Sequence, residues 1–98
     1  LRRAAELGNE HAQVRLGRVL TEGRGDLKGD DADRAACELF RKGIAKGNAK
    51  GMYLLGRLVL AGRGCEQDPV EGADLIERAA KAGDVEAADY LRRPGRRG

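Results

Sequence analysis

Apolar residues recur along the chain at intervals of three and four positions, the spacing of one face of an α-helix. Segments 9–22 and 48–61 carry this pattern, and their inward positions are Ala12, Leu16, Val19 and Leu20, then Gly51, Leu55, Leu58 and Val59. A second segment follows each, with inward positions at Ala36, Leu39, Phe40, Gly43 and Ile44, then at Gly72, Leu75, Ile76, Ala79 and Ala80. The pattern therefore predicts an all-α chain built of helical hairpins.

The hairpins are copies of one unit. "LGRVLTEGRG", residues 16–25, returns as "LGRLVLAGRG", residues 55–64, and the boundary glycines Gly8, Gly47 and Gly83 lie 39 and then 36 residues apart. The three extra residues of the first copy fall in "GDLKGDD", whose composition predicts a loop. A fixed period of this length indicates a stack of helical repeats.

Two glycines recur inside the predicted first helices. Gly17 and Gly56 stand where glycine costs about 1 kcal/mol relative to alanine, so we expect a neighbouring helix to approach too closely for a side chain. The G-x-G segments 23–25 and 62–64 follow these helices and are expected to turn the chain into the second helix.

Helix ends have their own signals. Gly47 and Gly83 stand where a helix stops and a left-handed residue is favoured. Asp68, which is followed by proline, is a predicted N-cap. Asp30 or Asp31 is expected to cap the corresponding helix of the first copy.

These residues resemble the Sel-1-like repeat family, relatives of the tetratricopeptide repeats. Copy one supplies the family's pattern at Gly8, Ala12, Leu16, Gly17, Gly23, Gly25, Asp31, Ala36 and Gly47. Copy two supplies it at Gly47, Leu55, Gly56, Gly62, Gly64, Asp68, Arg78, Ala79, Ala80 and Gly83. The chain departs from the pattern at Gly51, where the family prefers alanine.

The resemblance implies a right-handed α/α superhelix (solenoid) of about two and a half antiparallel hairpins. We expect the end of a preceding unit at 1–8, repeats at 9–47 and 48–83, and the start of a third repeat at 84–91. An Arg-rich tail, 92–98, is expected to be disordered.

The resemblance also implies a protein-interaction scaffold, of a kind frequent in bacterial assemblies, whose first helices line a concave face. Positions on those helices that face away from the partner helix hold His11, Arg15, Arg18, Lys50, Leu54, Arg57, Glu86, Tyr90 and Arg93. From them we predict a partner-binding stripe for an acidic or mixed peptide or helix, formed by Arg15, Arg18, Lys50, Leu54, Arg57 and Tyr90. The alternative is a solvated face without a partner. Open repeat ends also allow self-association.

Composition narrows the choice of function. The formal net charge is +3, but the tail 92–98 holds four arginines and no acid, and the rest of the chain is nearly neutral. Nucleic-acid binding through this tail is therefore an alternative and not the expectation. No apolar run approaches the roughly 20 residues of a membrane span. A role as the accessory domain of a larger enzyme stays open.

Candidate chemistry is sparse. The chain contains no serine and one histidine, and His11 is expected to face solvent, so we predict no enzyme activity, no cofactor and no metal site. Cys37 and Cys65 are expected to lie about 12 Å apart along the hairpin axis, beyond the roughly 7 Å limit for a disulfide. The loop could fold back and bring them closer, but we expect free thiols. Cysteine-rich members of the family clamp each hairpin with a disulfide, but those positions carry Met52 and Ala80. Reduced thiols slightly favour the cytoplasm.

Overall fold

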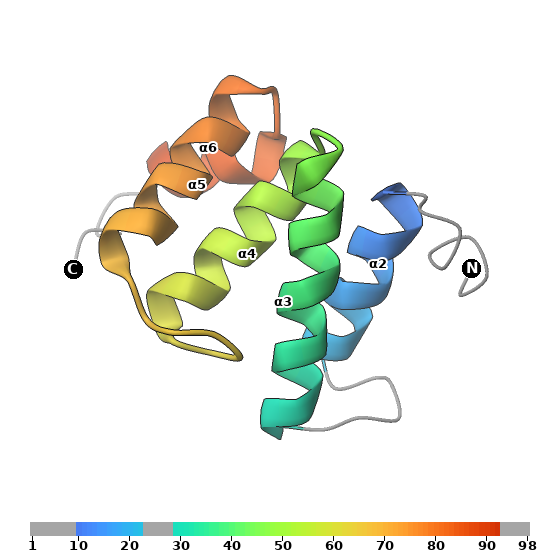
Figure 1. Cartoon of the computed structure of the whole chain (residues 1–98). Helices are drawn as coiled ribbons and strands as arrows, with labels where there is room; N and C mark the ends of the chain where they lie inside the picture. The colour runs from blue at the N-terminus through green and yellow to red at the C-terminus, as the bar shows by residue number, and fades with distance from the viewer. Residues whose placement is uncertain (1–9, 23–28, 93–98) are drawn as a thin grey trace.

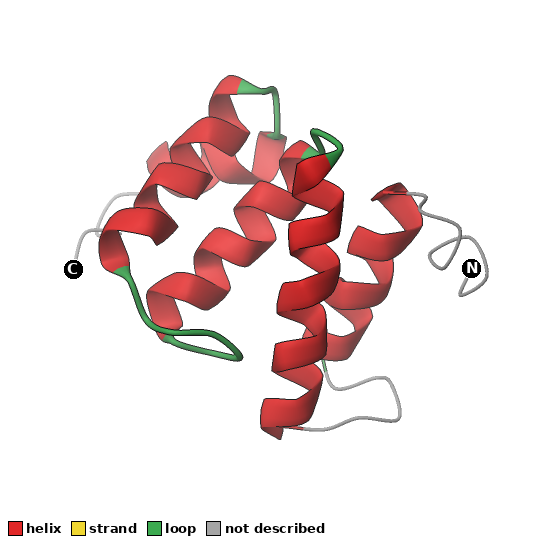
Figure 2. Cartoon of the chain, viewed as in Figure 1, coloured by secondary structure: helices red, strands yellow, loops and turns green. Residues whose placement is uncertain are grey.

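The structure is a computed structural model that describes residues 10–22 and 29–92. These residues form α-helices and the turns that join them, with no strand among them (Figure 2). The helices, in chain order, are α2 (Glu10–Thr21), α3 (Gly29–Ala45), α4 (Ala49–Ala61), α5 (Pro69–Lys81) and α6 (Val85–Arg92). Arg92, which we assigned to the tail, lies in the last turn of α6, and the remaining tail lies outside the described residues.

The helices stack as consecutive hairpins. Helix α2 packs against α3 and α4 packs against α5, while α3 lies on α4 and α5 on α6 (Figure 1). Smaller contacts join α2 to α4 and α4 to α6, so the first helices of successive units are neighbours. The predicted all-α solenoid is confirmed.

Helix starts follow the predicted capping rules in the second copy and depart from them in the first. The Asp68 carboxylate accepts hydrogen bonds from the backbone N–H groups of Val70 and Glu71, at 3.1 Å each. The expectation that Asp30 or Asp31 caps α3 is wrong, because both residues lie inside the first turn of that helix. There their carboxylates interact favourably with the positive end of the helix dipole.

The boundary glycines end helices as expected. Gly47 and Gly83 have φ angles of +86° and +102°, the left-handed region in which a side chain is strained. In the 62–64 turn both glycines also have positive φ. The first G-x-G segment, 23–25, lies outside the described residues.

Gly56 marks the closest approach of two helices. A Cβ atom there would lie 2.9 Å from the backbone oxygen of Gly72 in α5 and 2.8 Å from Cγ1 of Ile76. At Gly17 no side chain fits, as predicted, but the reason is not the close approach of a neighbouring helix backbone. A Cβ at Gly17 would lie 2.6 Å from the ring of Phe40, so an aromatic side chain, and not a backbone, occupies the space.

The core is continuous across the repeat boundary. Phe40 and Leu55 are fully buried members of one cluster although they belong to different hairpins. Val14, which the periodicity did not place inside, is 4% exposed and would touch a Cβ at Gly51 in the next repeat. Because α2 packs against both α3 and α4, its buried face is wider than that of a helix with one neighbour.

Candidate partner-binding groove

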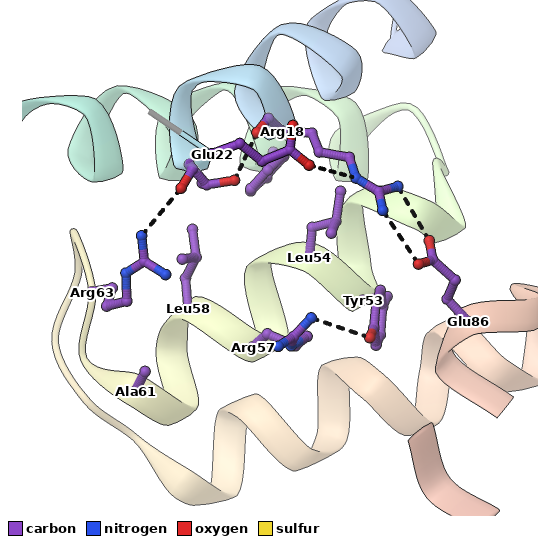
Figure 3. Close-up of a pocket in the computed structure, with 11 residues that line it drawn as sticks. Arg18, Glu22, Tyr53, Leu54, Arg57, Leu58, Ala61, Arg63 and Glu86 are labelled. Atoms are coloured by element: carbon purple, nitrogen blue, oxygen red, sulfur yellow. Dashed lines mark hydrogen bonds and ion pairs between the residues drawn. The ribbon is translucent and has the colours of Figure 1, made fainter. Parts of the chain in front are cut away.

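A hollow of about 290 Å³ lies between the first helices α2, α4 and α6 and the turn that follows α4 (Figure 3). Apolar and charged side chains both line it. The apolar ones are Phe40, Tyr53, Leu54, Leu58 and Ala61, and the charged ones are Arg18, Glu22, Arg57, Arg63 and Glu86. It therefore offers an apolar surface framed by charges of both signs.

The six residues predicted for the stripe line three neighbouring hollows. Arg18, Leu54 and Arg57 line the central hollow. Arg15 and Lys50 line a second hollow that also reaches Arg18, together with His11. Tyr90 lines a third hollow that also reaches Arg57. Because Arg18 and Arg57 are shared between neighbouring hollows, we call the three together the groove.

Two of the predicted cations are neutralised inside the groove. The Arg18 guanidinium donates to both carboxylate oxygens of Glu86, at 3.2 and 3.3 Å. The Lys50 ammonium bonds the same Glu86 and lies 2.6 Å from the buried Asp84. The sequence pattern missed this network, which ties α2, α4 and the start of α6 together.

The network shifts the pKa of both its central groups. Burial alone would lower the pKa of Lys50, but the hydrogen bonds to Asp84 and Glu86 outweigh it and raise that pKa above 10.5. The hydrogen bond from Lys50, reinforced by Arg18 and opposed by burial, lowers the pKa of Glu86 below 4.5. Both groups are thus held in their charged forms.

Asp84 joins this network because it also caps α6. Its carboxylate accepts a hydrogen bond from the backbone N–H of Ala87 at 2.8 Å. Asn48 does the same for α4, accepting from Gly51 at 2.8 Å. A sequence signal for both exists, because each follows a boundary glycine directly, and the repeat alignment could have identified them as N-caps.

An aromatic pair lies beside the groove, with one ring from α4 and one from α6. The rings of Tyr53 and Tyr90 meet edge to face, with centroids 6.2 Å apart and planes at 67°. The Arg57 guanidinium lies 5.8 Å from the Tyr53 ring centroid and 3.5 Å from its hydroxyl oxygen. Tyr53, buried and absent from our predicted set, thus orients Arg57 through a cation–π contact.

Arg57 and Arg15 are two further cations of the groove. Both are exposed, and among the described residues neither forms an ion pair with a carboxylate. Leu54 is only half-buried and packs on the two core clusters from the groove side. The groove therefore presents an apolar contact point beside an exposed cation.

Arg63, in the turn after α4, lines the central hollow of the groove. Its guanidinium makes two hydrogen bonds to the Asp33 carboxylate in α3, Nη2–Oδ1 at 2.9 Å and Nε–Oδ2 at 3.1 Å. Asp33 itself is buried, at 7% exposed. A Cβ at Gly64 would lie 2.3 Å from the Asp33 carbonyl carbon, so this turn lies directly on α3.

The same turn brings the two cysteines together. The Cys37 and Cys65 thiols donate to one acceptor, the backbone oxygen of Arg63, at 3.5 and 3.6 Å. Our expected separation of about 12 Å along the axis is therefore wrong, because the turn folds back onto α3. Both are free cysteines.

Three further observations concern metal binding, the single histidine and membrane spans in the part of the chain that the structure describes. There, no group of three or more His, Cys, Asp or Glu side chains is placed to hold a metal ion. His11 is exposed at the start of α2, and its Nδ1 lies 3.3 Å from the Asn48 amide nitrogen. None of the described helices combines the length and apolar character that a membrane span needs.

Comparisons with known proteins agree on the type of repeat. A family model described as Sel1 repeat matches residues 1–9, 10–48 and 49–84. A crystal structure of a Sel1 repeat protein from Oxalobacter formigenes is similar, with a TM-score of 0.80 and 31% sequence identity. The match covers 93% of this chain and 66% of that one, and its bacterial source fits the expectation from the sequence. No curated protein matches the chain.

Proposed function

Because the chain belongs to the Sel1 repeat family, whose members generally serve as protein–protein interaction modules, we propose that its groove binds a peptide or helix of a partner protein. Sel1 repeats are typically non-enzymatic scaffolds, and we assign this chain the same role. The bound segment carries an apolar side chain and an acidic one.

The observation that carries this proposal is the position of Leu54 beside Arg57. Leu54 is a half-buried apolar side chain in the central hollow, and Arg57 is an exposed guanidinium held over the Tyr53 ring. Interfaces concentrate binding energy in such apolar anchors and neighbouring arginines. An apolar residue of the partner would cover Leu54, and an acidic neighbour would bond Arg57.

The internal ion pairs refine the partner's chemistry. Glu86 and Asp84 together offset Arg18 and Lys50, so these cations act as structural ties across the groove. The charge left for a partner comes from Arg57 in the centre and Arg15 at one end. We therefore propose a mixed apolar and acidic segment, and not a uniformly acidic one.

The test is to select, from a library of displayed random peptides, those that bind the purified chain. We expect the selected peptides to share an apolar residue next to an acidic one. The variant Arg57→Glu should weaken their binding by about tenfold or more, corresponding to ~1.4 kcal/mol. The matched control is Arg41→Glu, the same charge reversal at an exposed position of α3, which should bind as the unaltered chain does.

Leu54→Ala tests the apolar part of the same site. Because Leu54 also packs against the core, circular dichroism must first show that the helices are intact. Equal binding by Arg57→Glu and Arg41→Glu would refute the groove as the binding site. Selection of peptides without any acidic residue would refute the proposed partner chemistry.

A further inference from the structure

We propose that Cys37 and Cys65 form a thiol–disulfide site, in which a small-molecule disulfide oxidises the pair to a bond across the repeat boundary. Cys37 belongs to α3, the second helix of one repeat. Cys65 belongs to the turn after α4, in the next repeat. The bond would tie the two repeats together at the turn after α4, whose Arg63 lines the groove.

The geometry of the pair carries this inference. Both sulfur atoms flank one oxygen atom, the backbone carbonyl oxygen of Arg63, at 3.5 and 3.6 Å. Since Cys65 lies in a turn and not in a helix, its sulfur can approach Cys37 without moving a helix axis. Cys65 also packs directly on the core cluster that contains Cys37.

Two further contacts hold the turn in place. The paired hydrogen bonds from Arg63 to Asp33 fix the residue two positions before Cys65. At Gly64 the turn backbone touches the α3 backbone at Asp33, one helical turn before Cys37. The proximity of the thiols is therefore built into the fold. These positions differ from Met52 and Ala80, where the family resemblance places hairpin disulfides.

The surroundings assign the two thiols different roles. Cys65 is partly exposed, whereas Cys37 is 3% exposed. Burial, together with the neighbouring Cys65 thiol, raises the pKa of Cys37 to about 12. Because a thiolate is the attacking species, Cys65 is the thiol that meets the oxidant, and Cys37 is the one that resolves the product.

The reaction is a pair of thiol–disulfide exchanges. The Cys65 thiolate attacks one sulfur of glutathione disulfide, whose S–S bond breaks and releases one glutathione. The Cys37 thiolate then attacks the Cys65 sulfur and displaces the second glutathione. The protein gives up two electrons and two protons, and the oxidant becomes two glutathione thiols.

The experiment exposes the folded chain to glutathione disulfide and maps the thiols by mass spectrometry. Trypsin separates the cysteines into peptides 35–41 and 64–78, so a cross-linked pair of these peptides reports the bond. We expect the cross-link to form in the folded chain, without retained glutathione, and much more slowly in denaturing urea. By closing a long loop, it should raise the melting temperature by roughly 10 °C.

Two variants complete the test. Cys37→Ala should keep a stable glutathione adduct on Cys65, because no resolving thiol is present. Cys65→Ala, a change at a partly exposed position of the turn, should leave Cys37 reduced and abolish the rise in melting temperature. The proposal fails if the unaltered chain accumulates the adduct on Cys65 with Cys37 still reduced. It fails equally if the disulfide forms between chains, or as fast in urea as in the folded state.

Discussion

Asp33 and Arg63 form a paired hydrogen bond across the boundary between two repeats, one in α3 and the other in the turn after α4. Asp33 is almost fully buried, while the Arg63 side chain is half-exposed. A planar guanidinium matches a carboxylate in this two-point geometry, which a lysine cannot reproduce. The contact therefore does more than neutralise a charge, because it sets where the turn lies on α3.

Removal of Arg63 is expected to destabilise the chain. Arg63→Ala leaves the buried Asp33 carboxylate without its partner. An unsatisfied buried polar group costs about 1–3 kcal/mol, and a charged one costs more. Chemical denaturation followed by circular dichroism measures this loss. Arg63→Lys should fall between the alanine variant and the unaltered chain, because it keeps the charge and loses the two-point geometry.

A double-mutant cycle isolates the pair. Asp33→Ala combined with Arg63→Ala should be less destabilised than the two single changes together, with a coupling energy of roughly 0.5–3 kcal/mol. Strictly additive effects would contradict the interaction, because they would mean that each side chain acts through other contacts.

Gly56→Ala is expected to destabilise the chain although alanine favours helices. The added Cβ would collide with the Gly72 backbone oxygen at 2.9 Å, which cannot move without shifting α5. Overpacking of this kind costs about 1–3 kcal/mol, more than the roughly 1 kcal/mol that alanine gains from helix propensity. The free energy of unfolding in urea measures the difference.

Gly51→Ala is the matched control on the same helix. Its nearest neighbour would be a methyl group of Val14 at 3.2 Å, a side chain able to adjust. We expect this variant to stay within about 1 kcal/mol of the unaltered chain, since the propensity gain offsets the tight contact. Equal destabilisation by both changes would argue against a backbone contact at Gly56.

The repeat architecture was predictable because its causes are local in sequence. The spacing of apolar residues, the G-x-G turn at 62–64 and the cap at Asp68 each depend on residues within a few positions of one another. Even the close approach at Gly56 leaves a local sign, because glycine inside a helix is costly unless it has a packing reason.

The groove's electrostatics were less predictable because they depend on contacts between distant segments. Arg18 and Glu86 are 68 positions apart, and their pairing follows from the stacking of α2 beside α4 and α6. Likewise, Cys65 meets Cys37 only because its turn folds back onto α3, whereas the sequence argument extended the helix axis through it. Periodicity places a residue on a face and does not reveal its partner on another helix.

Tyr90→Ala is expected to loosen α6. This short helix contacts α4 through few residues, and the edge-to-face contact of Tyr90 with Tyr53 is one of these contacts. Such a contact contributes about 0.5–1.5 kcal/mol beyond buried area. Hydrogen exchange should show faster exchange of α6 amides with little change in α3. Tyr90→Phe keeps the ring and should retain protection, and loss of protection in both variants would exclude the ring contact as its cause.

The ion pairs of Glu86 should make stability depend on pH in a defined direction. Because its folded-state pKa is lowered, Glu86 contributes stability that is present above its ordinary value of 4.5 and is lost as pH falls through the folded value. The raised pKa of Lys50 contributes stability that is present below 10.5 and is lost as pH rises through its folded value.

Glu86→Gln measures the acid side of this dependence. At neutral pH we expect a loss of about 0.5–1 kcal/mol, small because Glu86 is 42% exposed and water screens its pairs. The difference from the unaltered chain should shrink as pH falls below 4.5 and should also shrink in high salt. Glu77→Gln, at an exposed position of α5, is the control and should show neither effect. Parallel stability curves for the unaltered chain and Glu86→Gln throughout the acid range would contradict the assigned pairing.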